Sequence, residues 1–405
     1  MQTMTAPRQA YLDWLRILAI AGVLIFHSAM PFGAELDWHI RNKETSNIFL
    51  ELVFFMHLFR MPLLFFISGT VSYFMLQNRS GKRFVSMRIR RLLIPVLLAI
   101  LIIVPPQVYL ERVEQGFKGN FWQFYSRMFT SGPYPKGDIS WHHLWFVVYL
   151  LIYDIICAPL FVWVMSPKAR RFREGLAWLA RGKRVYLLAL PAIIIYTSLS
   201  LRYPETNDLV HDGCYFFYWM CFLLPGFFCV AQPALMDSLE RNRRFAFLMA
   251  FLSILTINYF RWNDVLPWDT LANWKSDPRT YAFLSLHVIC AWGWVFTAIG
   301  YGKKYLNRQH VSLNYLNQAV YPFYILHQTV IVILAFYVVK TSDTIGTKYV
   351  FIVLTTLFIS MGIYHLLIRP YSISRFLFGM KPRESRATGK NQPDIQEKRI
   401  LQPAS

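Results

Sequence analysis

The chain alternates between long apolar runs and short polar segments. Ten runs can each hold about 16 or more residues, against the roughly 20 that cross a bilayer as a helix. They fall near 12–33, 49–76, 92–110, 142–165, 185–201, 213–235, 245–260, 280–301, 317–339 and 348–368. The run at 245–260 is the weakest of the ten. The pattern predicts an all-α fold, a polytopic membrane helix bundle of about ten transmembrane helices.

Composition supports a membrane protein, and the distribution of charge predicts the orientation of the chain in the membrane. A mean hydropathy of +0.34 with 55% hydrophobic residues excludes a soluble globular protein. If the N-terminus is cytoplasmic, the cytoplasmic segments hold 28 Lys and Arg against 6 acids, whereas the outer segments hold 12 against 14. This matches the positive-inside bias and predicts that both termini are cytoplasmic. The net charge of +20 therefore indicates topology, and no nucleic-acid partner is needed to explain it.

The same patterning predicts one transmembrane domain, 1–375, followed by a polar tail, 376–405, that is disordered in the cytoplasm. The first apolar run lacks a cleavage site and is expected to be a retained helix. All five cysteines fall inside predicted spans and form no C-x-x-C pair. The sequence therefore indicates neither a disulfide framework nor a metal site, and no bound cofactor is expected.

The most informative candidates are two ionisable residues inside the first span. Arg16 and His27 are eleven positions apart, about 20° past three full helical turns, so they share one helix face. They would stand roughly 16 Å apart along the axis. Ionisable groups at membrane depth usually mark function. Neutral imidazole suits general acid–base work near pH 7, although a hydrogen-bonded core histidine is the alternative.

Asp13 lies three residues before Arg16, at the spacing of neighbours on a helix surface. The two are expected to pair near the cytoplasmic end of the first span. Such a pair could pin the helix end, or it could position an anionic ligand that enters from the cytoplasm. The pair alone does not separate these two roles.

The second span carries Arg60 about sixteen residues, or roughly 24 Å, from its cytoplasmic end. His27 has nearly the same depth in the first span. A cation beside a base could stabilise the oxyanion of an acyl-transfer reaction. It could equally be a structural arginine that binds carbonyls freed by Pro62.

A basic run follows the second span, with six Lys and Arg between Arg79 and Arg91. Such a run usually reports topology and contacts lipid headgroups. Arg88 and Arg91 share a helix face at the mouth of the bundle, however, and paired guanidinium groups suit phosphate binding. On the outer side, His143 opens the fourth span, and His327 lies within the ninth.

Several of these segments, in this order, resemble the acyltransferase-3 family of integral membrane acyltransferases. The first-helix pattern is Tyr-Leu-Asp-Trp-Leu-Arg at 11–16 followed by His27. The other matching segments are Phe-Phe-Ile-Ser-Gly at 65–69, Arg-Ile-Arg-Arg-Leu-Leu-Ile-Pro at 88–95, His-Leu-Trp-Phe at 143–146 and Tyr-Ile-Leu-His at 324–327. The likeness covers about residues 10 to 370. The family continues its second signature with phenylalanine, whereas this chain has Thr70.

The resemblance implies transfer of an acyl group from cytoplasmic acyl-coenzyme A to a hydroxyl of an extracytoplasmic glycan or other cell-envelope acceptor. His27 would then be catalytic, with Arg60 beside it, and Arg16 with Asp13 would support the donor channel. Arg88 and Arg91 would meet the coenzyme A phosphates.

His143 and His327 also fit the family and are expected among the substrate-binding residues. Short matches at 38–40, 59–61 and 72–73 are similar to the branch that succinylates osmoregulated periplasmic glucans. Acetyl and succinyl both stay open, and the expected location is a bacterial inner membrane.

A secondary transporter or flippase is the alternative, because intramembrane charges and Pro-broken helices are common to both classes. The enzyme is favoured because one helix links a cytoplasmic cation to an outward histidine. The arginine-rich loop at the inner mouth points the same way.

Overall fold

The structure is a computed structural model that describes residues 9–382, and within that range it is helical without a β-strand. The first half contains α1 (Ala10–Ala29), η1 (Met30–Phe32), α2 (Asn47–Leu76), α3 (Gly81–Leu98), η2 (Ala99–Ile103), α4 (Pro105–Glu114), α5 (Phe121–Ser131), η3 (His142–Leu144), α6 (Trp145–Met165), η4 (Pro167–Ala169) and α7 (Arg170–Leu179). The second half contains η5 (Arg184–Ala189), α8 (Leu190–Leu199), α9 (Gly213–Ala231), α10 (Pro233–Trp262), α11 (Pro267–Thr270), α12 (Pro278–Tyr305), α13 (Val311–Val338), α14 (Ile345–Ile363), η6 (Tyr364–Ile368) and α15 (Ser372–Leu377). The all-α membrane bundle is confirmed.

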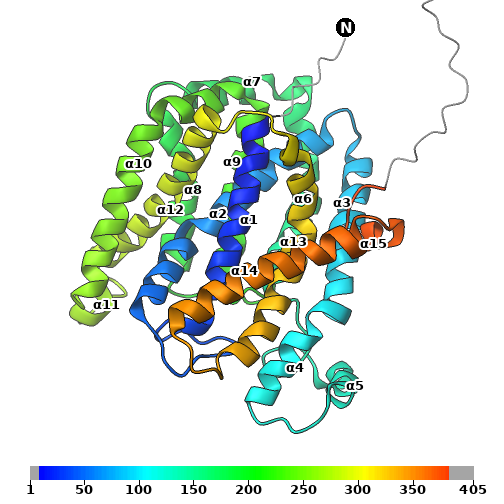
Figure 1. Ribbon diagram of the computed structural model, residues 1–405. Helices are drawn as coiled ribbons and strands as arrows, with labels where there is room; N and C mark the ends of the chain where they lie inside the picture. The colour runs from blue at the N-terminus through cyan, green and yellow to red at the C-terminus, as the bar shows by residue number, and fades with distance from the viewer. Residues whose placement is uncertain (1–8, 383–405) are drawn as a thin grey trace, which may run out of the picture.

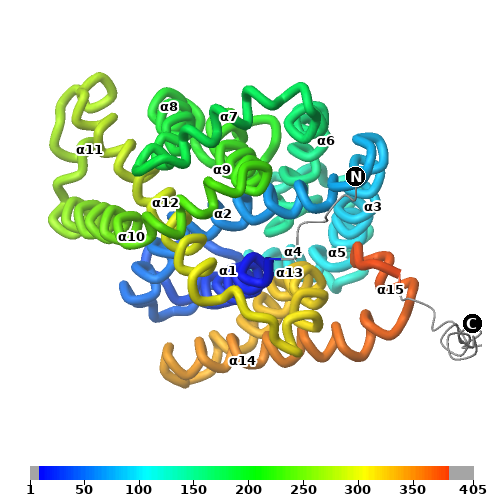
Figure 2. Tube along the Cα trace, turned by 90° about the horizontal axis from the view of Figure 1, so that it is seen from above, coloured from blue at the N-terminus to red at the C-terminus, as the bar shows by residue number. Residues whose placement is uncertain are grey.

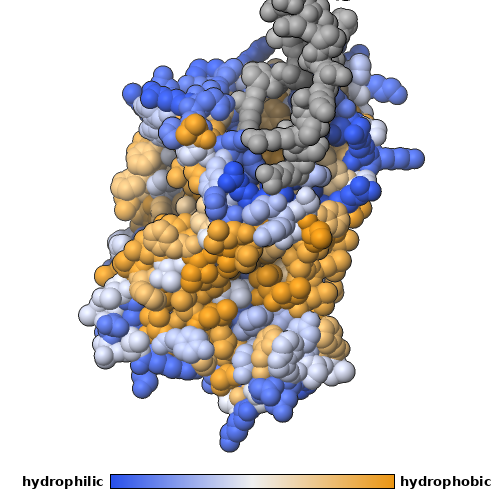
Figure 3. Space-filling model, turned by 45° about the vertical axis from the view of Figure 1, so that its right-hand side comes forward, coloured by the Kyte–Doolittle hydropathy of each residue, from blue (hydrophilic) through white to orange (hydrophobic). Residues whose placement is uncertain are grey.

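Nine of the helices in the described range are long and apolar enough to span a bilayer. The predicted span at 185–201 forms instead η5 and the short α8. This segment is long and apolar enough to span a bilayer only if it is counted together with α7, and the two are bent by 117° to each other. The weak run at 245–260 belongs to α10, which is 30 residues long. One face of the molecule shows a hydrophobic belt between two hydrophilic ends, as an integral membrane protein requires (Figure 3).

The core of the bundle is built around α1, which lies between α2, α12 and α13 when the molecule is seen from above (Figure 2). α10 and α14 lie at the periphery, and α14 crosses obliquely in front of the bundle (Figure 1). α1 ends at Ala29, just ahead of Pro31. α4 and α5 project from the lower end of the view, the end at which α1 finishes.

Two glycines bring α2 and α9 into backbone contact. A Cβ at Gly69 would lie 2.0 Å from the carbonyl oxygen of Leu223, and a Cβ at Gly226 would lie 2.0 Å from that of Phe66. Small residues permit such close approach between membrane helices. Gly69 ends the Phe-Phe-Ile-Ser-Gly segment of the sequence, so this segment has a packing role. It fixes the helix that carries Arg60.

The predicted tail begins at 376, and its first residues lie in the structure, where α15 ends at Leu377. The remainder of the tail, 383–405, lies outside the described residues.

Candidate active site

The site centres on a pair of histidines from α1 and α13. His27 Nδ1 lies 2.8 Å from His327 Nε2, and the two rings stack with centroids 5.1 Å apart. The other ring nitrogen of His327, Nδ1, lies 2.6 Å from the backbone oxygen of Tyr324. His327 is fully buried, whereas His27 keeps part of its surface accessible.

This geometry fixes the protons of a neutral pair. A carbonyl oxygen only accepts, so His327 Nδ1 carries a proton and its Nε2 presents a lone pair. His27 Nδ1 must then donate to that lone pair. The remaining nitrogen of His27, Nε2, is left as a free acceptor on the accessible residue. This is the arrangement of a general base oriented by a second group.

His143 packs against the histidine pair. Its ring lies edge-on to His327 with centroids 5.2 Å apart, and its Nε2 donates to the backbone oxygen of Ile325 at 3.1 Å. The Tyr324 hydroxyl donates to the backbone oxygen of His143. His143 Nδ1 is buried and has no hydrogen-bond partner. It is therefore a second acceptor beside the histidine pair, able to bind a hydroxyl.

Arg60 supplies the positive charge of the site. Its guanidinium carbon lies 3.4 Å from the ring centroid of Phe26, the residue before His27, and its charge acts on His27. The residue is 7% exposed, and its Nε and Nη1 are buried without a hydrogen-bond partner. A cation–π contact stabilises a buried guanidinium only in part. The contact with Phe26 confirms the expected common depth of His27 and Arg60. The unpartnered Nε and Nη1 of Arg60 can donate to an anion.

Asp13 and Arg16 lie at the other end of α1. Their side chains approach to 4.0 Å, which confirms the expected pair. The amide of Asn317 in α13 donates to Asp13 at 2.8 Å, and Arg16 donates to the Asn317 backbone oxygen at 3.2 Å. Arg16 and His27 thus both face α13, as their spacing predicts. No sequence pattern predicted Asn317 as the partner of Asp13 and Arg16.

Arg88 lies inside the bundle. Its guanidinium forms an ion pair with Asp154 of α6, and the Ser72 hydroxyl donates to the same carboxylate at 2.7 Å. Arg88 and Asp154 are 5% and 0% exposed. A phosphate would have to displace Asp154 to reach Arg88. Arg91, one turn further along α3, is half-buried and stays a predicted phosphate ligand.

We expect the Arg88–Asp154 pair to support the fold. Asp154→Asn alone should lower the free energy of unfolding by about 3–5 kcal/mol, because it leaves a buried cation uncompensated. The double variant Arg88→Met/Asp154→Leu should recover most of this loss. Thermal unfolding and coenzyme A affinity would be measured on both variants in detergent.

Arg91→Ala is the matched control, since it should weaken coenzyme A binding at unchanged stability. A double variant that is as stable as wild type but no longer binds coenzyme A would show that Arg88 contacts the donor.

Taken together, a polytopic helix bundle holds an oriented base, a second imidazole acceptor and an unsatisfied cation at one depth. These are the groups of a membrane enzyme that transfers acyl groups. The sequence profile of the acyltransferase-3 family, described as an acyltransferase domain, matches residues 9–365, and the chain belongs to this family. It is an integral membrane acyltransferase, which sets the transporter alternative aside.

Among curated proteins the chain is similar to glucans biosynthesis protein C of several Salmonella strains. The protein of Salmonella paratyphi A is 26% identical over 414 residues, which cover 96% of this chain and 99% of that protein. The protein of Salmonella typhimurium strain LT2 is 25% identical over 96% of this chain and 100% of its own length. No solved structure gave a significant match.

Proposed function

We propose that the protein moves an acetyl or succinyl group from cytoplasmic acyl-coenzyme A to a hydroxyl of an extracytoplasmic glycan, across a bacterial inner membrane. The single observation that carries the proposal is the His27–His327 contact, because it leaves His27 Nε2 as a free base beside Arg60. The name of the relatives, glucans biosynthesis protein C, supports a glucan as the acceptor.

The reaction needs no co-reactant beyond the two substrates. His27 Nε2 accepts the proton of the acceptor hydroxyl while the oxygen attacks the thioester carbonyl carbon. The carbonyl oxygen becomes an oxyanion, which the Arg60 guanidinium stabilises. Collapse of the tetrahedral intermediate breaks the carbon–sulfur bond, and the departing thiolate takes the proton from His27. The products are the acyl ester and free coenzyme A.

His327 and His143 have distinct supporting roles in this scheme. His327 accepts from His27 Nδ1 throughout and keeps the ring oriented, so it is a positioning residue. His143 Nδ1 accepts from a second hydroxyl of the sugar, which would hold the acceptor. Both roles follow the hydrogen-bond directions set by the backbone oxygens of Tyr324 and Ile325.

The donor enters at the cytoplasmic end of α1. The basic stretch 79–91, which includes Arg91, would hold the coenzyme A phosphates, and Asp13 with Arg16 would line the way for the pantetheine arm. Arg16 and His27 would stand roughly 16 Å apart along α1. An extended pantetheine arm is about as long, so the thioester can reach His27 while the nucleotide stays at the inner mouth.

Sidedness tests this proposal. Sealed vesicles of known orientation would receive radiolabelled acyl-coenzyme A on one face at a time, with the glucan acceptor on the other. Ester should form only when the donor is on the cytoplasmic face, and free coenzyme A should stay there. Mass spectrometry then identifies the group, with about 42 Da added for acetyl and about 100 Da for succinyl. Ester formation with donor and acceptor on the same outer face would contradict the scheme, as would uptake of intact donor without ester.

A further inference from the structure

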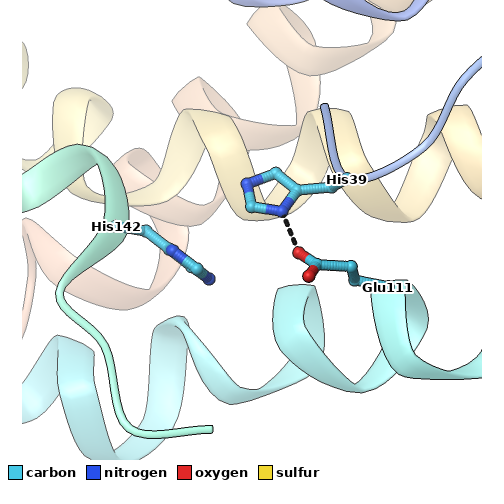
Figure 4. Close-up of side chains that lie close together, drawn as sticks. All are labelled: His39, Glu111 and His142. Atoms are coloured by element: carbon cyan, nitrogen blue, oxygen red, sulfur yellow. Dashed lines mark hydrogen bonds and ion pairs between the residues drawn. The ribbon is translucent and has the colours of Figure 1, made fainter. Parts of the chain in front are cut away.

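A second cluster of ligand-bearing side chains lies near the histidine pair. It joins His39, from the loop between η1 and α2, with Glu111 of α4 and His142, the first residue of η3 (Figure 4). One nitrogen or oxygen from each residue lies within 4.8 Å of the other two. In residues 9–382 it is the one group of three or more His, Cys, Asp or Glu side chains with this property. No metal site was predicted from the sequence.

The surrounding hydrogen bonds aim these three side chains at one another. His39 Nδ1 contacts Glu111 Oε2, and its Nε2 lies 3.3 Å from the side-chain amide of Gln328. Glu111 is 4% exposed, and its other oxygen accepts from the Tyr134 hydroxyl at 3.2 Å.

His142 carries a buried ring nitrogen whose hydrogen-bonding capacity is unused. Its Nδ1 lies 3.1 Å from the Ser140 hydroxyl, whereas its Nε2 is buried without a hydrogen-bond partner. Its ring packs against that of His39 with centroids 4.7 Å apart. The backbone φ of His142 is 38°, in the left-handed region that non-glycine residues rarely adopt. The fold thus accepts strain at the residue that carries the unsatisfied nitrogen.

We propose that His39 Nδ1, Glu111 Oε2 and His142 Nε2 bind a divalent transition-metal ion, for which Zn²⁺ is the best chemical fit. Two imidazoles and one carboxylate are the ligand set of many zinc sites with an open fourth position. Metal–ligand bonds of about 2.0–2.2 Å place tetrahedral ligand atoms roughly 3.4 Å apart. The metal replaces the proton between His39 and Glu111, so these two separate slightly while His142 approaches.

The local charge permits a cation. Arg112, the neighbour of Glu111, donates to the Asp138 carboxylate at 2.8 Å and to the backbone oxygens of Pro135 and Gly137. Arg112 Nη1 also lies 3.5 Å from the other oxygen of Glu111, Oε1. Because Asp138 already compensates the charge of Arg112, Glu111 Oε2 can still neutralise part of the charge of the metal. Gln328 Nε2 faces His39 and also donates to Gln107 Oε1 at 3.1 Å. If both amides turn over together, Gln328 Oε1 accepts from His39 Nε2 and from Gln107, which gives His39 the outer partner that metal-bound imidazoles usually have.

The cluster adjoins the active site through two pairs of neighbours in sequence. His142 precedes His143, and Gln328 follows His327. A metal would tie the 33–46 loop, α4 and η3 together at one edge of the site, and its fourth position would bind a water or a hydroxyl of a polyhydroxylated ligand. Metal binding does not depend on the proposed acyl transfer, and it can be measured without it.

The test uses the purified full chain in detergent. Protein stripped with a chelator would receive ZnCl₂, and bound zinc would be counted after dialysis by elemental mass spectrometry. We expect about one Zn²⁺ per chain, and tetrahedral visible absorption when Co²⁺ is used instead. Glu111→Gln and His142→Ala should each weaken zinc binding more than about 100-fold, beyond the effect typical of outer-shell changes.

His211→Ala is the matched control. His211 also contacts a carboxylate, Asp208, at 2.9 Å, but it is exposed and has no third ligand, so this variant should bind zinc like wild type. Folding of the variants would be judged by the thermal midpoint of the metal-free proteins. If both variants fail to fold, the wild-type zinc count and Co²⁺ spectrum still decide the question. Wild type without retained zinc, or folded variants that retain it, would overturn the proposal.

Discussion

Replacing His27 by alanine is expected to lower the rate of acyl transfer by about 100- to 10,000-fold, the usual cost of losing a general base. His27 Nε2 is the free acceptor that the contact with His327 leaves. The change adds no charge to the membrane interior, so insertion and stability should be close to wild type. Initial rates of ester formation, together with the thermal midpoint, would be measured in detergent.

His287→Ala is the matched control for this variant. His287 also lies in a membrane-spanning helix, but its Nδ1 bonds the backbone oxygen of Phe283 in its own helix. Its loss should leave the rate within a few-fold of wild type. His327→Gln should give an intermediate loss with an altered pH–rate profile, because the base loses its orientation while remaining present. Near-normal transfer by His27→Ala would remove His27 from the mechanism.

The second large effect is expected at Arg60. Arg60→Gln should lower kcat by about 100- to 1,000-fold, the scale of losing one oxyanion donor, with a smaller effect on donor affinity. Arg60→Lys should recover part of the rate, since it restores the charge without the guanidinium fork. Steady-state kinetics with acetyl- and succinyl-coenzyme A would show whether Arg60 binds the oxyanion of the reaction or the distal carboxylate of the succinyl group.

Equal losses with both donors support the oxyanion role. A loss confined to succinyl-coenzyme A would show that Arg60 binds the distal carboxylate of the donor instead. Arg261→Gln is the matched control, because Arg261 also lies over a phenylalanine ring, Phe54, at 3.6 Å, but has Glu51 as its partner at 2.8 Å. It should change kcat little.

Helix periodicity explains what the sequence could predict of this site. The α-helical period alone places Arg16 and His27 on one face, and both contact α13. Counting residues from the helix ends that are predicted to be cytoplasmic places Arg60 at the depth of His27, and its guanidinium lies over Phe26. The helix face and the depth of a residue each depend on one helix alone, so both can be predicted from a single sequence.

The contacts between helices were not predictable in the same way. His27 meets His327 across 300 positions, and Arg88 meets Asp154 across 66. Which residues meet depends on how helices pack and slide against each other, and hydropathy does not encode that register. The bend of 117° before η5 could not be predicted for a related reason: hydropathy gives the length of an apolar run and not the direction of its helix.

The cluster at His39 shows a third limit. Its residues come from a loop, a helix end and a short 3₁₀ turn, and such segments have no periodic pattern. The only signal in the sequence was an acid, Glu111, at the end of an apolar span, and it has many ordinary explanations.

The buried Arg88–Asp154 pair also bears on how the chain enters the membrane during synthesis. A lone aspartate at the centre of an inserting helix costs about 2.5–3.5 kcal/mol. The ribosome makes α3 first, so Arg88 is already in place when Asp154 emerges 66 residues later. We therefore expect Asp154 to enter the membrane beside this counter-ion, so that an ion pair and not a lone acid is transferred into lipid. On this expectation the contact also has a role during assembly, because α3 would have to be inserted before α6.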